Sequence, residues 1–130
     1  LEKFDNFHWL GSLQYPDKVR EYLTEIDVYA LITGMDLAPL SLKEAQLMEK
    51  PVVATNVGGI PLQVIDGVTG YLIESKREAA DRILSILRKS ELGSKLGLQG
   101  KEHIRRNFLI TLHLKHFLKM HLEKVNLKLL

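Results

Sequence analysis

The chain has 130 residues, of which 45% are hydrophobic and 26% are charged, as is ordinary for one globular domain with its own core. It contains no cysteine, which excludes a disulfide scaffold and a thiolate metal site. The net charge is +2, but 5 Lys and Arg residues lie in residues 1–75 and 13 in residues 76–130. Because these 13 are spaced among apolar residues at helical intervals, we interpret them as solvated helix faces and expect no nucleic-acid partner.

The apolar runs of the chain are short. None approaches the roughly 18 residues that a membrane-crossing helix requires, and the first residues lack the basic-then-apolar order of a secretory signal. We therefore expect a cytoplasmic protein in which residues 1–130 form one domain without membrane contact. Within it, residues 7–75 are expected to form a sheet core and residues 76–130 a helical part.

The first half of the chain alternates between strand and helix patterns. Residues 7–10 predict a short strand with Trp9 in the core, and residues 28–32 predict a strand that is covered on both faces, as in a parallel sheet. Further strands are expected at residues 51–55 and 71–73. The predicted helices begin at Asp17, at about Leu42 and at about Leu62. The first of them has an apolar face spaced at i, i+3, i+4 and i+7, made by Val19, Tyr22, Leu23 and Ile26.

The second half predicts helices alone. Ser75 and Glu78 have the spacing of a capping box. The helix that follows is expected to bury one apolar stripe, made by Ala80, Ile83, Leu84 and Leu87. Three glycines punctuate residues 92–100, so we expect a loose helical pair there and a separate short helix over residues 101–106. A long amphipathic helix is predicted over residues 111–127. Its apolar side is formed by Leu114, Phe117, Leu118, His121 and Val125.

The alternation predicts the α/β class, with a mostly parallel Rossmann-like sheet between layers of helices. Ligands bind such sheets beyond the carboxyl ends of the strands, which selects the loops at residues 33–41 and 56–61. The first loop leads into a helix N-terminus, where free amide groups and the helix dipole favour an anion. The second contains Gly58 and Gly59, which allow close approach of the backbone. Together they predict a site for a nucleotide diphosphate.

Residues 7–75 carry a family resemblance, which is most specific in three blocks. They are PVVAT-x-VGGIP, DG-x-TGYL, and an acid-x7-Glu pair formed by Asp36 and Glu44. In this order and spacing they resemble the C-terminal domain core of retaining glycosyltransferases with two Rossmann-like domains, the GT-B fold of glycosyl transferases group 1. The resemblance implies a nucleotide-diphospho-sugar as donor substrate, transfer of a hexosyl group, and no cofactor or metal.

The resemblance also implies roles for the two acids. Glu44 corresponds to the glutamate that binds the ribose hydroxyls of the donor, and Asp36 takes the place of a catalytic glutamate close to the donor sugar. The residues by themselves leave simpler alternatives open. Ser41 and Glu44 have capping-box spacing, so Glu44 could cap its helix, and Asp36 could form a loop turn.

The remaining implied contacts come from backbone segments. Leu40 and Ser41 belong to a segment whose backbone meets the donor sugar and phosphates, in which Pro39 replaces a glycine of the family pattern. Gly58 and Gly59 correspond to paired glycines beside the donor cleft, although they could serve only a tight turn.

Other features depart from the family pattern. Glu49 stands where a glycine is usual, which should cost up to about 1 kcal/mol if its backbone is left-handed, and Leu62 stands where a glutamate is usual. The upstream βαβ portion with its basic pair and the acceptor-binding N-terminal domain are not in this sequence. We therefore expect the chain alone to be inactive and its partner to be that N-terminal domain. The alternative is a non-catalytic nucleotide-binding or protein-interaction module, with the final helix forming a swapped homo-oligomer.

Overall fold

Three short parallel strands form the centre of the molecule. The computed structural model describes residues 4–128, and the side chains up to residue 123. The strands β1 (Tyr29–Leu31), β2 (Val52–Thr55) and β3 (Tyr71–Ile73) lie in the order β1-β2-β3. Ala30 pairs with Val53, which in turn pairs with Tyr71. Each strand is a short apolar run, as expected for strands covered by helices.

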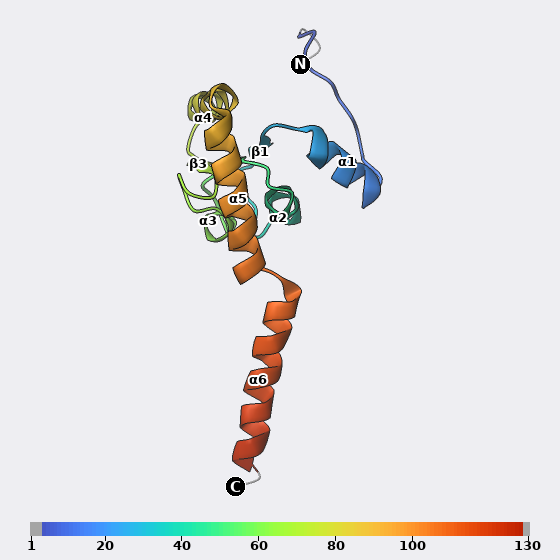
Figure 1. Cartoon of the computed structure of the whole chain (residues 1–130), viewed down its shortest axis with the longest axis vertical. Helices are drawn as coiled ribbons and strands as arrows, with labels where there is room; N and C mark the ends of the chain where they lie inside the picture. The colour runs from blue at the N-terminus through green and yellow to red at the C-terminus, as the bar shows by residue number, and fades with distance from the viewer. Residues whose placement is uncertain (1–3, 129–130) are drawn as a thin grey trace.

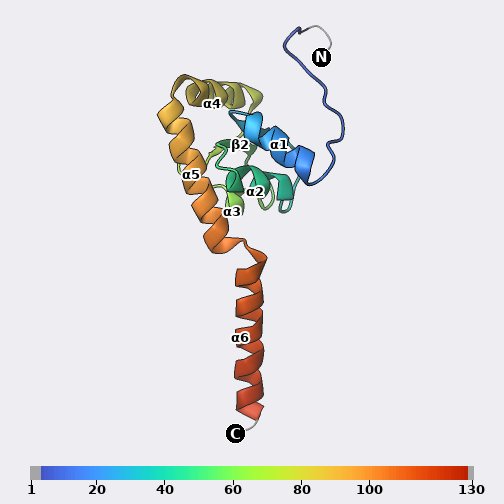
Figure 2. The same cartoon turned by 45° about the vertical axis from the view of Figure 1, so that its right-hand side comes forward.

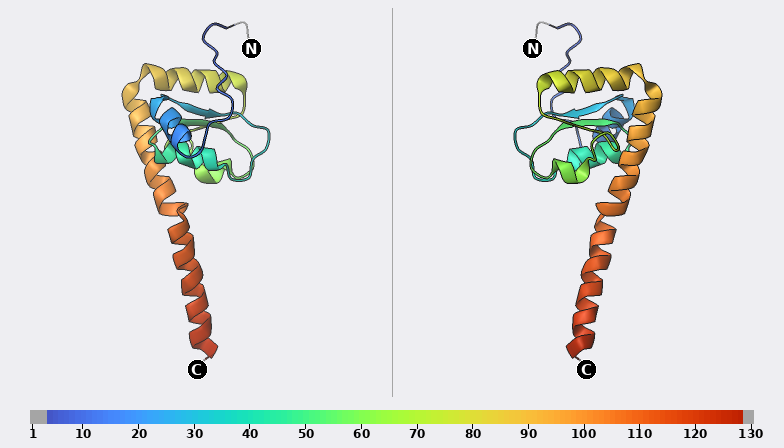
Figure 3. Two further views of the ribbon diagram at one scale, coloured as in Figure 1. Left: turned by 90° about the vertical axis from the view of Figure 1, so that its right-hand side faces the viewer. Right: turned by 90° about the vertical axis from the view of Figure 1, so that its left-hand side faces the viewer.

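Helices cover both faces of this sheet. On one face α1 (Asp17–Glu25), α2 (Leu40–Leu47) and α3 (Ile60–Gln63) pack against Val52 and Ala54. On the other face α4 (Lys76–Arg88) packs against Val53. Figure 3 shows α4 on one side of the sheet with α2 and α3 on the other, and Figure 2 shows α1 beside α2. The predicted α/β layer sandwich with a parallel sheet is confirmed.

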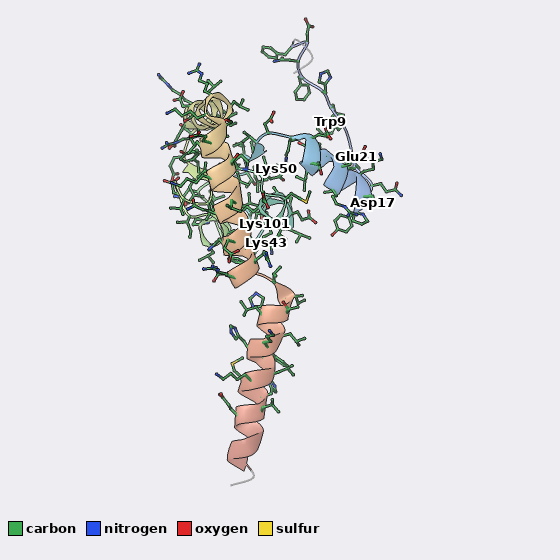
Figure 4. All side chains as sticks on the ribbon, in the orientation of Figure 1. Trp9, Asp17, Glu21, Lys43, Lys50 and Lys101 are labelled. Carbon is green, nitrogen blue, oxygen red and sulfur yellow. The ribbon has the colours of Figure 1, made fainter. Side chains whose placement is uncertain are left out.

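The β1 side of the sheet differs from the prediction. Within residues 4–128, β1 pairs with β2 alone. Ala30 at the centre of β1 is exposed, so the strand is not covered on both faces. The predicted strand at residues 7–10 is wrong: this segment is extended, pairs with no described strand, and leaves Trp9 85% exposed (Figure 4). Strand propensity is not enough when the backbone has no partner strand. The sheet core therefore begins at residue 29 and not at residue 7.

Helix α5 (Ser90–Asn107) is one continuous helix where the sequence predicted several pieces. The glycines that suggested breaks lie on one buried side of it, at Gly93, Gly97 and Gly100. A Cβ at Gly97 would lie 1.9 Å from the carbonyl oxygen of Glu49. Each glycine disfavours helix by up to about 1 kcal/mol, and here the close approach of α5 to its neighbours outweighs this cost.

Helix α4 begins as predicted and buries a different stripe. The Ser75 hydroxyl accepts a hydrogen bond from the Glu78 amide at 3.2 Å, as expected for the N-cap. The predicted stripe is wrong in register, because Ala79 and Ile86 are buried while Ala80, Leu84 and Leu87 are exposed. Tertiary packing selects which side of an apolar arc is covered.

Helix α6 (Ile110–Lys128) extends away from the sheet, as Figure 1 shows. Its position agrees with the prediction, and its apolar side chains Leu114, Phe117 and Leu118 are exposed. Val125 lies beyond the residues whose side chains are described. Within residues 4–128, none of the helices combines the length and apolarity needed to cross a bilayer.

Candidate functional site

The two loops selected from the sequence meet at one edge of the sheet. One follows β1 and leads to α2, and the other follows β2 and leads to α3. Because both strands are parallel, their carboxyl ends lie at the same edge. A threonine at the end of β2 joins the loops. The Thr55 hydroxyl accepts a hydrogen bond from the Thr33 amide at 3.1 Å and donates one to the Thr33 carbonyl at 2.8 Å.

A second junction involves the paired glycines. The Gly59 amide donates to the Asp36 carbonyl at 3.0 Å. A Cβ at Gly58 would lie 1.9 Å from the Asp36 carbonyl oxygen, and one at Gly59 would lie 1.6 Å from that of Leu37. Gly58 has φ +53, a conformation that favours glycine. The glycines thus form the tight turn that was the simpler alternative for them. The backbone that they allow to approach is that of the loop at residues 33–41.

Asp36 has a structural role in its own loop. Its carboxylate accepts a hydrogen bond from the Ala38 amide at 3.2 Å, which is the turn geometry considered as the simpler alternative. Its backbone carbonyl takes the Gly59 amide, so this residue connects both loops. The second carboxylate oxygen forms no hydrogen bond within the described residues, and the side chain is half-buried.

Helix α2 begins at the end of the first loop. Its N-cap residue is Pro39, and no side chain of the described residues caps it. The first amide groups of the helix are therefore free to bind a ligand. Because the helix begins at Leu40, Ser41 lies inside its first turn. The simpler alternative, in which Ser41 and Glu44 form a capping box, is therefore wrong.

Glu44 lies on the wall of a hollow between α1 and α2. The hollow has a volume of about 220 Å³. The walls beside Glu44 are mostly apolar and are formed by Tyr15, Pro16, Val19, Arg20, Leu23, Leu47 and Met48. The half-buried carboxylate forms no hydrogen bond or ion pair with the residues that the structure describes. Leu40 is one turn earlier in α2 and is exposed. Glu44 is thus outside the junction that joins Asp36 to the glycines.

Two departures from the family pattern have clear structural settings. Glu49 has φ +59, which confirms the left-handed backbone expected at this position. Its carboxylate forms an ion pair with Lys101 of α5 at 2.5 Å. The side chain of Leu62 is 72% exposed beside the second loop.

Thr55 was missed by the reasoning from sequence. The sequence did contain a sign of its role, because Thr55 is the one polar residue at the end of an otherwise apolar strand. Asn56, the next residue, donates from its side-chain amide to the Glu74 carboxylate at 2.7 Å and so ties the second loop to the end of β3. Among the described residues, no three His, Asp or Glu side chains gather as metal ligands.

A parallel sheet between helical layers, with two loops joined at its carboxyl edge, defines a Rossmann-like ligand-binding domain. The family model described as glycosyl transferases group 1 matches residues 1–103. The chain therefore belongs to the glycosyl transferases group 1 family.

Similar proteins agree with this assignment. Trehalose synthase of Pyrococcus horikoshii is 39% identical over 79 residues, which are 61% of this chain and 19% of that protein. The chain thus spans about a fifth of the length of this relative. Among solved structures, the C-terminal domain of a glycosyl transferase group 1 family protein from Francisella tularensis has a TM-score of 0.70 and 22% identity, with 78% of this chain and 53% of that chain covered. HepE of Anabaena, in complex with UDP-glucose, has a TM-score of 0.70 and 20% identity, with 80% and 30% covered. These structures share the fold.

Proposed function

We propose that this chain is the donor-binding part of a retaining glycosyltransferase that transfers a hexosyl group from a nucleotide-diphospho-sugar. In this proposal the donor lies at the carboxyl edge of the sheet, against the loops at residues 33–41 and 56–61. An N-terminal domain binds the acceptor and completes the enzyme, so the chain alone is inactive. The solved relative HepE binds UDP-glucose, and trehalose synthase acts on sugars by name, which supports a nucleotide sugar as the ligand.

The observation that carries the proposal is the environment of Glu44. Its half-buried carboxylate has no partner among the described residues and lies on the wall of a hollow. It belongs to α2, the helix whose N-terminus opens at the loop junction. A carboxylate can accept two hydroxyl hydrogen bonds at once, so it suits the two hydroxyls of a ribose. The apolar walls of the hollow would accept the flat face of the base.

The diphosphate would be held by backbone groups. The loops at residues 33–41 and 56–61 contain no Lys or Arg, so neither can neutralise the diphosphate with a cationic side chain. The free amides at Leu40 and Ser41, together with the dipole of α2, favour the anion there. When the glycosidic bond to the diphosphate breaks, the same amides would stabilise the charge of the leaving group. This chemistry requires no metal and no cofactor.

Asp36 would lie beside the donor sugar. One carboxylate oxygen is used by the Ala38 amide, which fixes the side chain and leaves the other oxygen for a sugar hydroxyl. Because Asp is one methylene shorter than Glu, the sugar must approach the loop closely. Gly58 and Gly59 hold that loop in place from behind, since they pack against its backbone.

Calorimetric titration of the chain with UDP, GDP and ADP, and with their sugar conjugates, tests this proposal. We expect one nucleotide to bind in the micromolar to millimolar range. Glu44→Ala should abolish this binding, and Glu44→Gln should weaken it, since an amide retains only one acceptor oxygen. Glu91→Ala, which removes an exposed acid from the start of α5, is the matched control and should leave binding unchanged. A folded chain that binds none of the nucleotides at millimolar concentration would refute the proposal.

A second candidate function is a protein-interaction module that pairs with itself. The observation in its favour is the exposed apolar side of α6, formed by Leu114, Phe117 and Leu118. Sedimentation of the chain over a hundredfold range of concentration would reveal a dimer. A monomer throughout that range would eliminate this candidate.

A further inference from the structure

Side chains from two other helices hold the carbonyl end of α3. A helix of four residues is too short to be stable by itself, and its last carbonyl groups have no partner within the helix. The imidazole Nε2 of His103, in α5, bonds the Leu62 carbonyl at 3.1 Å. The side-chain amide of Gln46, in α2, donates to the Gln63 carbonyl at 3.1 Å. Both carbonyls at the end of α3 are thus satisfied from outside.

The orientation of the His103 ring is defined by its neighbours. The amide nitrogen of Asn107 lies 3.2 Å from Nδ1 and 2.9 Å from the His103 carbonyl. Since this amide donates, Nδ1 acts as the acceptor. Nε2 then carries the proton, which it donates to Leu62. The ring of Phe108 lies against the imidazole at 5.5 Å between centroids and 62° between planes. These contacts therefore select one tautomer and one orientation of the imidazole ring, in which Nε2 faces the Leu62 carbonyl.

The position of α3 is transmitted to the junction between the two loops. Ile60, the first residue of α3, follows Gly59 directly, so no flexible residue separates them. The Gly59 amide bonds the Asp36 carbonyl at 3.0 Å, and the Cβ sides of both glycines face backbone atoms. Such close packing leaves no room for independent movement. A displacement of α3 must alter the contact between Gly59 and Asp36.

We propose that His103 is a positioning residue of the donor site, which holds the Gly58–Gly59 turn against the Asp36 loop through the Leu62 carbonyl. The expected consequence is that the held turn binds the nucleotide diphosphate more tightly, and this consequence rests on the proposed function. The structural step of the inference, from His103 to Gly59, is independent of that function. His103 acts through α3, and the donor does not contact it.

Amide hydrogen exchange measures the structural step directly. In His103→Ala the Gly59 amide should exchange about 3- to 10-fold faster, as expected when one hydrogen bond is lost locally. His103→Gln should restore the exchange rate, because the Gln amide nitrogen can occupy the place of Nε2. His103→Asn should fail to do so, because its amide nitrogen reaches only the place of Nδ1. His116→Ala, which removes an exposed histidine from α6, is the matched control.

The outcomes separate this inference from the proposed function. Unchanged Gly59 exchange in His103→Ala, an equal increase for the amides of β2, or failure of His103→Gln to restore the rate would each overturn the inference. In the nucleotide titration, His103→Ala should weaken the affinity for UDP, GDP or ADP about 3- to 10-fold, with recovery in His103→Gln. If the wild-type chain binds none of these nucleotides, the proposed function fails, and hydrogen exchange still decides whether His103 positions the turn.

Discussion

Substitution of Gly59 by alanine would force the two loops of the candidate site apart. A Cβ at this position would lie 1.6 Å from the Leu37 carbonyl oxygen, whereas ordinary contacts begin at 3.4 Å. The separation would therefore have to increase by about 1.8 Å, as the difference of these two distances shows. The bond from the Gly59 amide to the Asp36 carbonyl, now 3.0 Å, does not survive such a movement.

The stability cost follows from these two effects. Overpacking costs about 1–3 kcal/mol, and the lost hydrogen bond costs about 1 kcal/mol more. We expect Gly59→Ala to destabilise the chain by about 2–4 kcal/mol. With a slope of about 1.5 kcal/mol per molar urea, the unfolding midpoint should fall by about 1.3 to 2.7 M. Urea unfolding followed by circular dichroism measures this shift.

Gly34 provides the matched control in the first loop. A Cβ at Gly34 would meet no atom of the described residues within 4 Å, so Gly34→Ala should change stability by less than about 0.5 kcal/mol. Nucleotide binding should be lost in Gly59→Ala and retained in Gly34→Ala. If Gly59→Ala unfolds at the same urea concentration as the wild type, the loops have room that the structure does not show, and the reasoning is wrong.

Three further predictions concern the contacts around these loops. Thr55→Val retains the shape of the side chain but leaves the Thr33 amide and carbonyl unpaired, so urea unfolding should show a loss of about 1–3 kcal/mol; an unchanged midpoint would contradict the junction. Gly97→Ala, whose Cβ would lie 1.9 Å from the Glu49 carbonyl oxygen, should destabilise by about 1–3 kcal/mol, although alanine favours helix; a gain in stability would show that α5 does not approach Glu49 so closely. Glu49→Gly removes left-handed strain of up to about 1 kcal/mol and an exposed ion pair with Lys101, which typically contributes only about half as much. The net gain of about 0.5 kcal/mol should raise the thermal midpoint by about 2–4 °C, and a fall would mean that the ion pair dominates.

The local patterns of the sequence determined most of the elements around the site. The strand over residues 71–73 is observed at its predicted bounds, and the N-cap at Ser75 is formed as its side chain dictates. Helices near residues 17, 42 and 62 also follow their patterns within two residues. These features depend on neighbours in the chain, which the sequence displays directly. The alternation of strands and helices then placed the candidate loops at one edge of a parallel sheet.

Tertiary packing decided the rest, because the deciding partners are distant in the chain. From the sequence alone, Gly97 suggests a break in the helix. In the structure it allows α5 to lie against the Glu49 carbonyl. From the sequence alone, Trp9 suggests a core residue. In the structure it is exposed, because its segment pairs with no strand of the described residues. The bond from His103 to Leu62 spans 41 positions, and no local pattern encodes such a pair. The sequence by itself determined the class of fold and the loops of the site, whereas the contacts that hold those loops together became visible only in three dimensions.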